Sequence, residues 1–216
     1  MKNSIFISSL FLLLSGALYA QSSGWDNHWD TREKFVFGAK AGINISNVWD
    51  ERSQDFEADP KVGFAGGLFV GIPIGKWIGI QPEVLISQKG FKGSGTIIGY
   101  PYSFSRTSTH LAIPILFQVK PIKFLTILAG PQFSYLLRQK DVNSFGDFSQ
   151  EIENEFNNDN LRRNMLGFVA GVDVNISYIV ISARCGWDFQ YNRGDGTSVT
   201  PRYKNQWIQL TVGVKI

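Results

Sequence analysis

Residues 35–46 read Phe-Val-Phe-Gly-Ala-Lys-Ala-Gly-Ile-Asn-Ile-Ser, and their alternation decides the fold. Every odd position is apolar, and the even positions are mostly small or polar. Because successive side chains of a β-strand point to opposite faces, this segment predicts a strand with one apolar face and one polar face. Its twelve residues also suit a tilted strand that crosses a membrane, which needs about 9–11 residues.

The same alternation recurs in seven further segments of the chain. We predict these strands at residues 62–72, 78–90, 109–119, 124–137, 164–175, 178–191 and 206–216. Short turns join them at 73–77, 120–123 and 175–177, in alternation with long loops at 47–61, 91–108, 138–163 and 192–205. An even number of strands with short and long connections in turn is typical of outer-membrane barrels, whose short turns face the periplasm.

The sequence therefore predicts an all-β fold, an eight-stranded antiparallel up-and-down transmembrane β-barrel of the outer membrane over residues 34–216. A soluble lipocalin-like barrel is the alternative. It would place its apolar face inside, whereas the apolar rows here are too uniform for a face in water.

Residues 1–20 have the pattern of a cleaved signal peptide: Lys2, a short apolar run, and small residues ending at Ala20. Residues 21–33 lack periodicity, and we expect a mobile periplasmic lead-in, with a tether or plug as the alternative. The net charge of +3 includes no basic tract, which argues against a nucleic-acid partner. The single Cys185 excludes an internal disulfide.

Four phrases occur in order along the strands: Gly-Ala-Lys-Ala-Gly-Ile-Asn-Ile-Ser (38–46), Ile-Gln-Pro-Glu-Val-Leu-Ile-Ser-Gln-Lys-Gly (80–90), Leu-Ala-Ile-Pro-Ile-Leu (111–116) and Leu-Ala-Gly-Pro (128–131). On these phrases the chain resembles the PorT-like outer-membrane β-barrel family of the Bacteroidota over residues 34–216. The resemblance implies a barrel architecture. Because the name-bearing member resembles a component of protein secretion and gliding machinery, it also implies a place in a larger envelope or secretion assembly. Ile216 departs from the terminal Phe of many outer-membrane barrels.

Charged residues fall on the inward face of the predicted strands. Lys40, Glu83 and Arg184 lie at similar depth, and Asp173 lies somewhat lower. A second set, Lys89, Asp188 and Arg138, lies higher. Because charges inside so narrow a barrel must pair, we expect a structural ion-pair core in which Glu83 bridges Lys40 and Arg184. A proton or ion path is the alternative.

Other inferences concern the rims and the strand interiors. We expect the aromatic residues Trp77, Phe124 and Tyr178 at the periplasmic rim, and Trp49, Trp187, Tyr191 and Trp207 at the external rim. The prolines at 82, 114 and 131 lie inside strands and predict bulges.

The residues that could carry chemistry are few. Ser108 and His110 share one face, but the spacing brings no acid to them, so we predict no catalytic residues. No spacing fits a metal site, and we expect no cofactor. The glycines of residues 93–99 miss the dinucleotide-binding pattern and indicate a flexible loop.

The external loops carry many acids. The candidate interaction surface consists of Asp50, Glu51 and Asp55 in the first loop and Glu151, Glu153 and Glu155 in the third. These residues suit a solvated surface, or a binding surface for a partner or for divalent ions that bridge lipopolysaccharide.

The sequence thus favours a non-enzymatic outer-membrane protein with a structural or interaction role. Its expected partners are outer-membrane lipid, lipopolysaccharide and other envelope proteins. A narrow solute or ion pore is the second candidate, and a lipid-modifying enzyme is the third.

Overall fold

The computed structural model describes residues 30–49, 57–97, 100–145, 148–155, 164–192 and 203–216. These ranges contain nine strands: β1 (Val36–Trp49), β2 (Glu57–Pro73), β3 (Ile78–Ile97), β4 (Tyr100–Ile122), β5 (Leu125–Phe145), β6 (Phe148–Glu155), β7 (Asn164–Ile176), β8 (Ile179–Asp188) and β9 (Lys204–Lys215). Within the same ranges no helix is long and apolar enough to cross a membrane.

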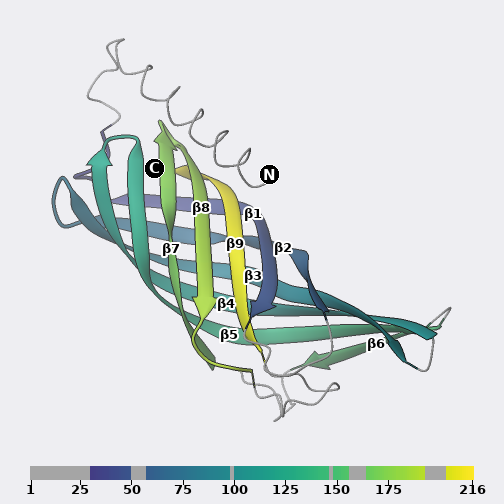
Figure 1. The fold of residues 1–216 in the computed structure, drawn as a ribbon. Coiled ribbons are helices and arrows are strands. Elements are labelled where there is room, and N and C mark those ends of the chain that lie inside the picture. Colours follow the sequence, from purple (N-terminus) through teal and green to yellow (C-terminus); the bar gives the residue numbers. More distant parts are fainter. Residues whose placement is uncertain (1–29, 50–56, 98–99, 146–147, 156–163, 193–202) are drawn as a thin grey trace, which may run out of the picture. The chain divides into compact units, whose positions relative to one another are not determined.

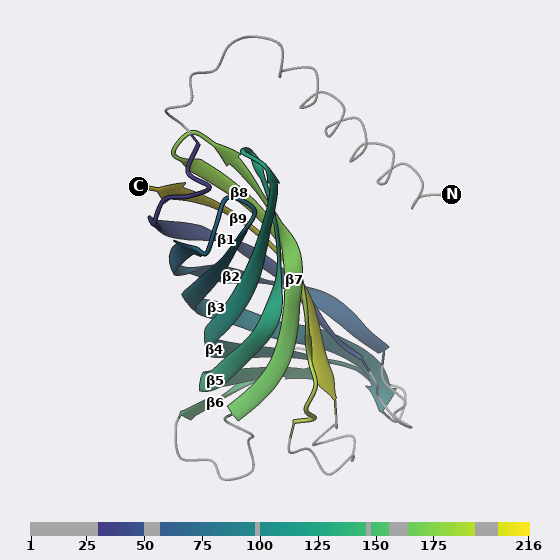
Figure 2. The ribbon, with the colours of Figure 1, turned by 90° about the vertical axis from the view of Figure 1, so that its left-hand side faces the viewer.

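Eight of these strands close into a barrel (Figures 1 and 2). Each pairs antiparallel with its neighbours in the order β1-β2-β3-β4-β5-β7-β8-β9, and β9 returns to β1. The predicted eight-stranded antiparallel barrel is confirmed. The ninth strand, β6, lies outside this ring and pairs with β5.

The distribution of side chains is the reverse of that in a soluble protein. All eight barrel strands carry large apolar residues that are exposed, among them Leu68 (64% exposed) and Val214 (62%). The alternate positions are buried and largely polar, as Gln209 and Thr211 are in β9. In water this arrangement would expose apolar area on every strand, whereas in a bilayer the outer face meets lipid. A lipocalin-like barrel is therefore excluded.

The strands continue well beyond the predicted membrane segments at one end (Figure 1). There β2, β3, β4, β5 and β6 form a paired sheet extension, which we define as residues 57–60, 91–97, 100–107, 138–145 and 148–155. The prediction of long loops at 91–108 and 138–163 is wrong for these residues, and residues 93–97 are part of β3 rather than a flexible loop. The reason is physical: beyond the bilayer a strand no longer needs an apolar face, so the alternation stops while the backbone pairing continues.

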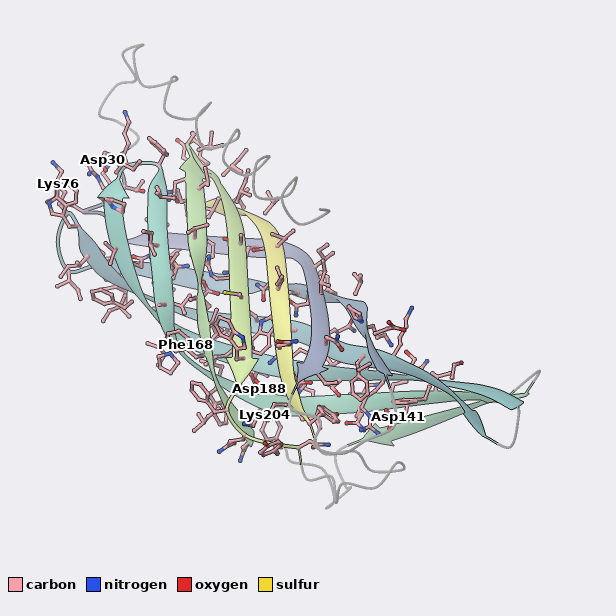
Figure 3. All side chains as sticks on the ribbon, viewed as in Figure 1. Asp30, Lys76, Asp141, Phe168, Asp188 and Lys204 are labelled. Atoms are coloured by element: carbon pink, nitrogen blue, oxygen red, sulfur yellow. The ribbon has the colours of Figure 1, made fainter. Side chains whose placement is uncertain are left out.

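Short turns close the opposite end at residues 74–77, 123–124 and 177–178, close to the predicted positions. Trp77 (57% exposed) and Tyr178 (54%) lie there with their rings outward, as expected for the rim of a membrane barrel. Figure 3 shows Lys76 at this end and Asp141 on the sheet extension at the other.

The expectation of bulges at the strand prolines is wrong. At Pro82, Pro114 and Pro131 the register is the same on both sides. A proline lacks one ladder donor, but its backbone angles suit an extended strand, so the strand passes through without an extra residue.

Instead, the register shifts at other places: between Pro60 and Ala65 of β2, and at two places in the β4–β5 pair, one of which is a bulge at Leu137 of β5. Thr109 pairs with Arg138 while the adjacent His110 pairs with Leu136, which leaves Leu137 between them. Beyond this extra residue the two faces of β5 exchange, so that Arg138 is exposed and Gln139 is buried. The prediction that Arg138 faces the lumen is therefore wrong.

Trp207 is also misplaced by the sequence reading. It is 3% exposed and faces the lumen rather than the external rim. The strict alternation of β9 requires this, because Ile208 and Leu210 on the same strand face outward.

Candidate functional site

A cluster of four charged residues fills the middle of the lumen. The Lys40 Nζ lies 2.6 Å from Glu83 Oε2, and the Arg184 Nη2 lies 3.7 Å from Glu83 Oε1. The Arg184 Nη1 is 2.7 Å from Asp173 Oδ1. We call these four residues the central cluster. The structure thus brings together Lys40, Glu83, Arg184 and Asp173 from four different strands, with Glu83 between the two cations.

Glycines on neighbouring strands make room for these long side chains. Gly213 of β9 lies opposite Lys40, and Gly171 of β7 lies opposite Arg184. A Cβ at Gly213 would come within 2.8 Å of the Lys40 Cβ, and one at Gly171 within 2.8 Å of the Arg184 Cδ. Since real Cβ atoms do not approach so closely, the two glycines are part of the central cluster's geometry.

Amides and hydroxyls surround the central cluster. Gln81 Nε2 donates to Glu83 Oε1 (2.7 Å), and Gln118 Nε2 donates in turn to Gln81 Oε1. Above them Asn44 Nδ2 donates to Ser87 Oγ at 2.6 Å. All five side chains are buried. These bonds satisfy several of the polar groups that have left bulk water, and the side chains occupy the lumen.

A second charged layer lies nearer the sheet extension. Lys89 Nζ is 3.3 Å from Asp188 Oδ1, and Asn205 Nδ2 donates to Asp188 Oδ2 at 2.7 Å. The same ammonium stands 3.3 Å from the centroid of the Trp207 ring, a cation–π contact. Trp207 belongs to a buried apolar group with Leu116, Leu128 and Val169.

Aromatic residues close the lumen at its outer end. Phe91 is fully buried and makes edge contacts with Tyr203 (4.9 Å between centroids) and Phe104 (5.6 Å). Arg106 holds Asp141 through two hydrogen bonds, from Nε to Oδ1 and from Nη2 to Oδ2, each of 2.8 Å. We call these five residues the external cap. All five of its residues lie in segments that the sequence analysis predicts as loops.

The Arg106 guanidinium lies outside the membrane-crossing part of β4. Burial alone would lower its pKa, but Tyr203 and Asp141 outweigh burial and raise the pKa above its ordinary value. The guanidinium is therefore a permanent cation, and its bidentate contact with Asp141 joins β4 to β5 at the base of the sheet extension.

The residues considered for catalysis do not assemble into a triad. Ser108 and His110 are both buried and inward, but Ser108 Oγ donates to Gln139 at 3.4 Å. Among the described residues no carboxylate is hydrogen-bonded to His110, and Lys89 is the charged group that acts on it electrostatically. Across the same described ranges no three His, Cys, Asp or Glu residues gather as metal ligands would.

The acidic candidate surface is only partly within the described residues. Asp50, Glu51 and Asp55 lie outside them. Glu151, Glu153 and Glu155 belong to β6. In the register, Glu153 lies opposite Lys140, and Glu155 lies opposite Arg138. Two of the three acids thus occupy positions next to cations of β5.

Comparison with known proteins agrees with this architecture. The model of the family described as "Outer membrane protein beta-barrel domain" matches residues 19–214. The chain belongs to this family. As a member of the outer membrane protein β-barrel domain family, it is an integral β-barrel protein of the outer membrane, and its exposed apolar belt contacts membrane lipid.

Several solved outer-membrane barrels are similar in fold at low identity. The attachment invasion locus protein Ail of Yersinia pestis is 12% identical, with a TM-score of 0.47, over 84% of this chain and 98% of that one. Neisserial surface protein A is 11% identical, with a TM-score of 0.43, over 84% and 97%. OprG of Pseudomonas aeruginosa is 11% identical, with a TM-score of 0.42, over 86% and 97%. A search among curated proteins finds no match.

Proposed function

We propose that this protein is a non-enzymatic anchor that holds an interaction surface outside the outer membrane. The barrel fixes the protein in the lipid, and the sheet extension meets another envelope protein. The resemblance to PorT-like barrels agrees with a place in a larger envelope or secretion assembly.

The observation that carries the proposal is the length of the strands. β4 has 23 residues, and β3 and β5 have 20 and 21. Since a tilted strand crosses the bilayer in about 9–11 residues, each of these strands continues beyond the membrane, and the seven or eight residues at its outer end belong to the sheet extension. At about 3.3 Å per residue, they extend about 25 Å as backbone-paired sheet rather than as loop. A projection of this size suits recognition.

The outer edge of the sheet extension is β6. In the described part of the chain, β6 pairs on one side only, with β5. An edge strand presents unpaired N–H and C=O groups to which an extended segment of a partner adds a strand. The three acids in the sequence of β6 (Glu151, Glu153 and Glu155) would favour a partner strand that carries basic residues.

The other two candidate functions receive less support. The central cluster, the second charged layer and the external cap occupy successive levels of the lumen, which disfavours a pore. The lack of an acid at His110 among the described residues disfavours a hydrolytic enzyme.

Photo-crosslinking in intact cells tests the proposal. A crosslinking amino acid at Ile152 of β6 should yield an adduct with a protein of one defined mass. The same amino acid at the lipid-facing Val214 should yield none. A variant in which residues 140–153 are replaced by a two-residue turn should still insert, but its native particle should lose mass after gentle detergent extraction. No adduct at Ile152, together with an unchanged particle mass, would overturn the proposal.

A further inference from the structure

Two lysines, Lys61 of β2 and Lys92 of β3, lie together on the outer face of the barrel wall. The Lys61 Nζ donates to Ser105 Oγ of β4 at 2.7 Å and also to Thr107 Oγ1. Lys92 is opposite the same Ser105 in the register, and residues paired in this way share one face of the sheet. That face is the outer one, because Phe91, the residue before Lys92, points into the external cap. We call Lys61 and Lys92 the lysine pair.

The lysine pair lies at the height where the headgroups of the outer leaflet are expected. Val62 follows Lys61 directly and is 62% exposed, and Phe64 and Ile86 continue the exposed apolar belt on β2 and β3. In the other direction the sheet extension begins, and Lys92 already belongs to it (Figure 1). The pair therefore separates the surface that meets lipid tails from the surface that meets water, which is the level that a lysine side chain favours.

Neither ammonium group of the pair has a carboxylate partner within the described ranges. The Lys61 Nζ is bonded to neutral hydroxyls, and Asp59 lies opposite Lys92 in the register without forming an ion pair with it. Burial lowers the pKa of Lys61, and repulsion by Lys92 lowers this pKa further. Asp141 acts in the opposite direction, but Arg106 already holds it. An anion between the two lysines would offset their repulsion.

Hydroxyl groups complete the site. Ser105 and Thr107 each accept a hydrogen bond from Lys61, and a hydroxyl that accepts keeps its own O–H as a donor. The surface thus offers two ammonium groups and two hydroxyls to the oxygens of one anion. Arg138 and Lys140 lie on the same face of β5, but each has an acid of β6 opposite it in the register, so the site is confined to β2, β3 and β4.

We propose that the lysine pair binds a phosphate group of an outer-leaflet lipid, the phosphorylated glycolipid lipopolysaccharide. Lys61 and Lys92 donate to the phosphate oxygens, and the hydroxyls of Ser105 and Thr107 add weaker bonds. A lipid suits the site better than free phosphate, because its acyl chains pack on the apolar belt while its phosphate meets the lysines. The site is separate from the edge of β6 and does not depend on the proposed function.

Native mass spectrometry of the purified full chain in a non-ionic detergent tests the site. Bisphosphorylated lipid A, the phosphate-bearing part of lipopolysaccharide, and the same lipid A without its phosphates are titrated separately. We expect a saturable adduct with the phosphorylated form and at least tenfold weaker binding of the other, since charge-assisted hydrogen bonds are lost. Equal binding of the two forms would overturn the proposal. Displacement of lipid A by an equimolar amount of inorganic phosphate would assign a free phosphate instead and would also overturn it.

Single substitutions make the test specific to the lysine pair. Lys61→Gln should weaken the binding of phosphorylated lipid A about tenfold, and Lys92→Gln should weaken it about fivefold. Asp59→Asn removes a negative charge beside Lys92 and should strengthen binding about two- to fivefold.

The matched control is Lys76→Gln, which changes an exposed lysine in a turn at the opposite end of the barrel. This variant should bind like the parent, and gel migration of unheated samples verifies that all variants are folded. If Lys76→Gln weakens binding as much as Lys61→Gln and Lys92→Gln do, or if none of the three changes it, the lysine pair is not the site.

Discussion

Glu83 is the residue on which the charge balance of the central cluster depends. It lies between Lys40 and Arg184, and its side chain is 2% exposed. Removing one partner from a buried ion pair costs about 3–5 kcal/mol, because the remaining charge is left without compensation. We therefore expect Glu83→Gln to lower the free energy of unfolding by about that amount, measured by denaturant titration in micelles.

The control for this variant is Asp59→Asn. Asp59 is an exposed acid on β2, so the same change of charge should shift stability by less than about 0.5 kcal/mol. If Glu83→Gln and Asp59→Asn unfold at the same denaturant concentration as the parent, the central cluster does not stabilise the barrel.

Trp207 tests the packing of the lumen without any change of charge. A Cβ added at Gly186 would overlap the six-membered ring of this indole. Gly186→Ala should therefore displace the ring from beneath Lys89 and cost about 1–3 kcal/mol of unfolding free energy, as overpacking does. In the turn variant Gly75→Ala the new methyl group meets no atom within 4 Å, and stability should be nearly unchanged. If the two variants are equally stable, the side chains around Trp207 rearrange to accept the added methyl group without cost.

At the scale of single residues, alternation and rise are enough to place Lys40, Glu83 and Arg184 at one level of the lumen. The same rule, applied strictly to β9, predicts that Trp207 faces the lumen. Arg138 is different, because the bulge at Leu137 leaves no trace in the pattern of apolar residues. The glycines opposite Lys40 and Arg184 are visible in the sequence, but their meaning depends on a register that only the folded sheet defines.

At the scale of elements, the membrane determines which part of each strand can be predicted. Within the lipid, one face of each strand must be apolar, so the alternation in the sequence predicts the face of every residue in the membrane part of β1 and β9. Past the lipid, the outer face no longer has to be apolar, and polar or charged residues interrupt the alternation in residues 91–97 and 138–145. Backbone pairing, which fixes these segments as strands, has no such signature, and β6 was missed for that reason.

The bulge in β5 leads to a prediction about deletions. Removing Leu137 takes out the extra residue, so Leu136, Arg138 and Gln139 would alternate regularly and keep their present faces. The deletion variant should fold into a barrel that, like the parent, migrates faster on gels when unheated. Deleting Phe133 instead would turn the buried Ser134 toward lipid and should prevent or strongly impair folding. If both deletions fold equally well, the bulge does not set the faces of β5.

At the scale of the whole molecule, a closed ring of eight strands leaves a lumen that side chains are able to fill. The amide network, two ion-pair layers and the external cap occupy successive levels of it, from the side of the short turns to the outer end. An ion that crossed would have to break these pairs and leave its own hydration shell, at a cost of several kcal/mol for each charge exposed. A filled lumen also supports the walls, since the pairs Lys40–Glu83, Arg184–Glu83 and Lys89–Asp188 link strands that are not neighbours in the sheet.

This reasoning predicts that the purified protein does not conduct. In planar bilayers, with insertion verified by gel migration of the recovered protein, we expect no resolved single-channel steps in molar salt. Glu83→Gln leaves two cations in place and should remain closed, because the external cap is untouched. The double variant Glu83→Gln/Phe91→Ala also lacks the fully buried ring of the external cap. If the central cluster and the external cap are the two barriers to conduction, this double variant should give small channel openings. Regular steps from the unaltered protein would instead favour the narrow pore and would show that the ion pairs exchange partners on the timescale of conduction.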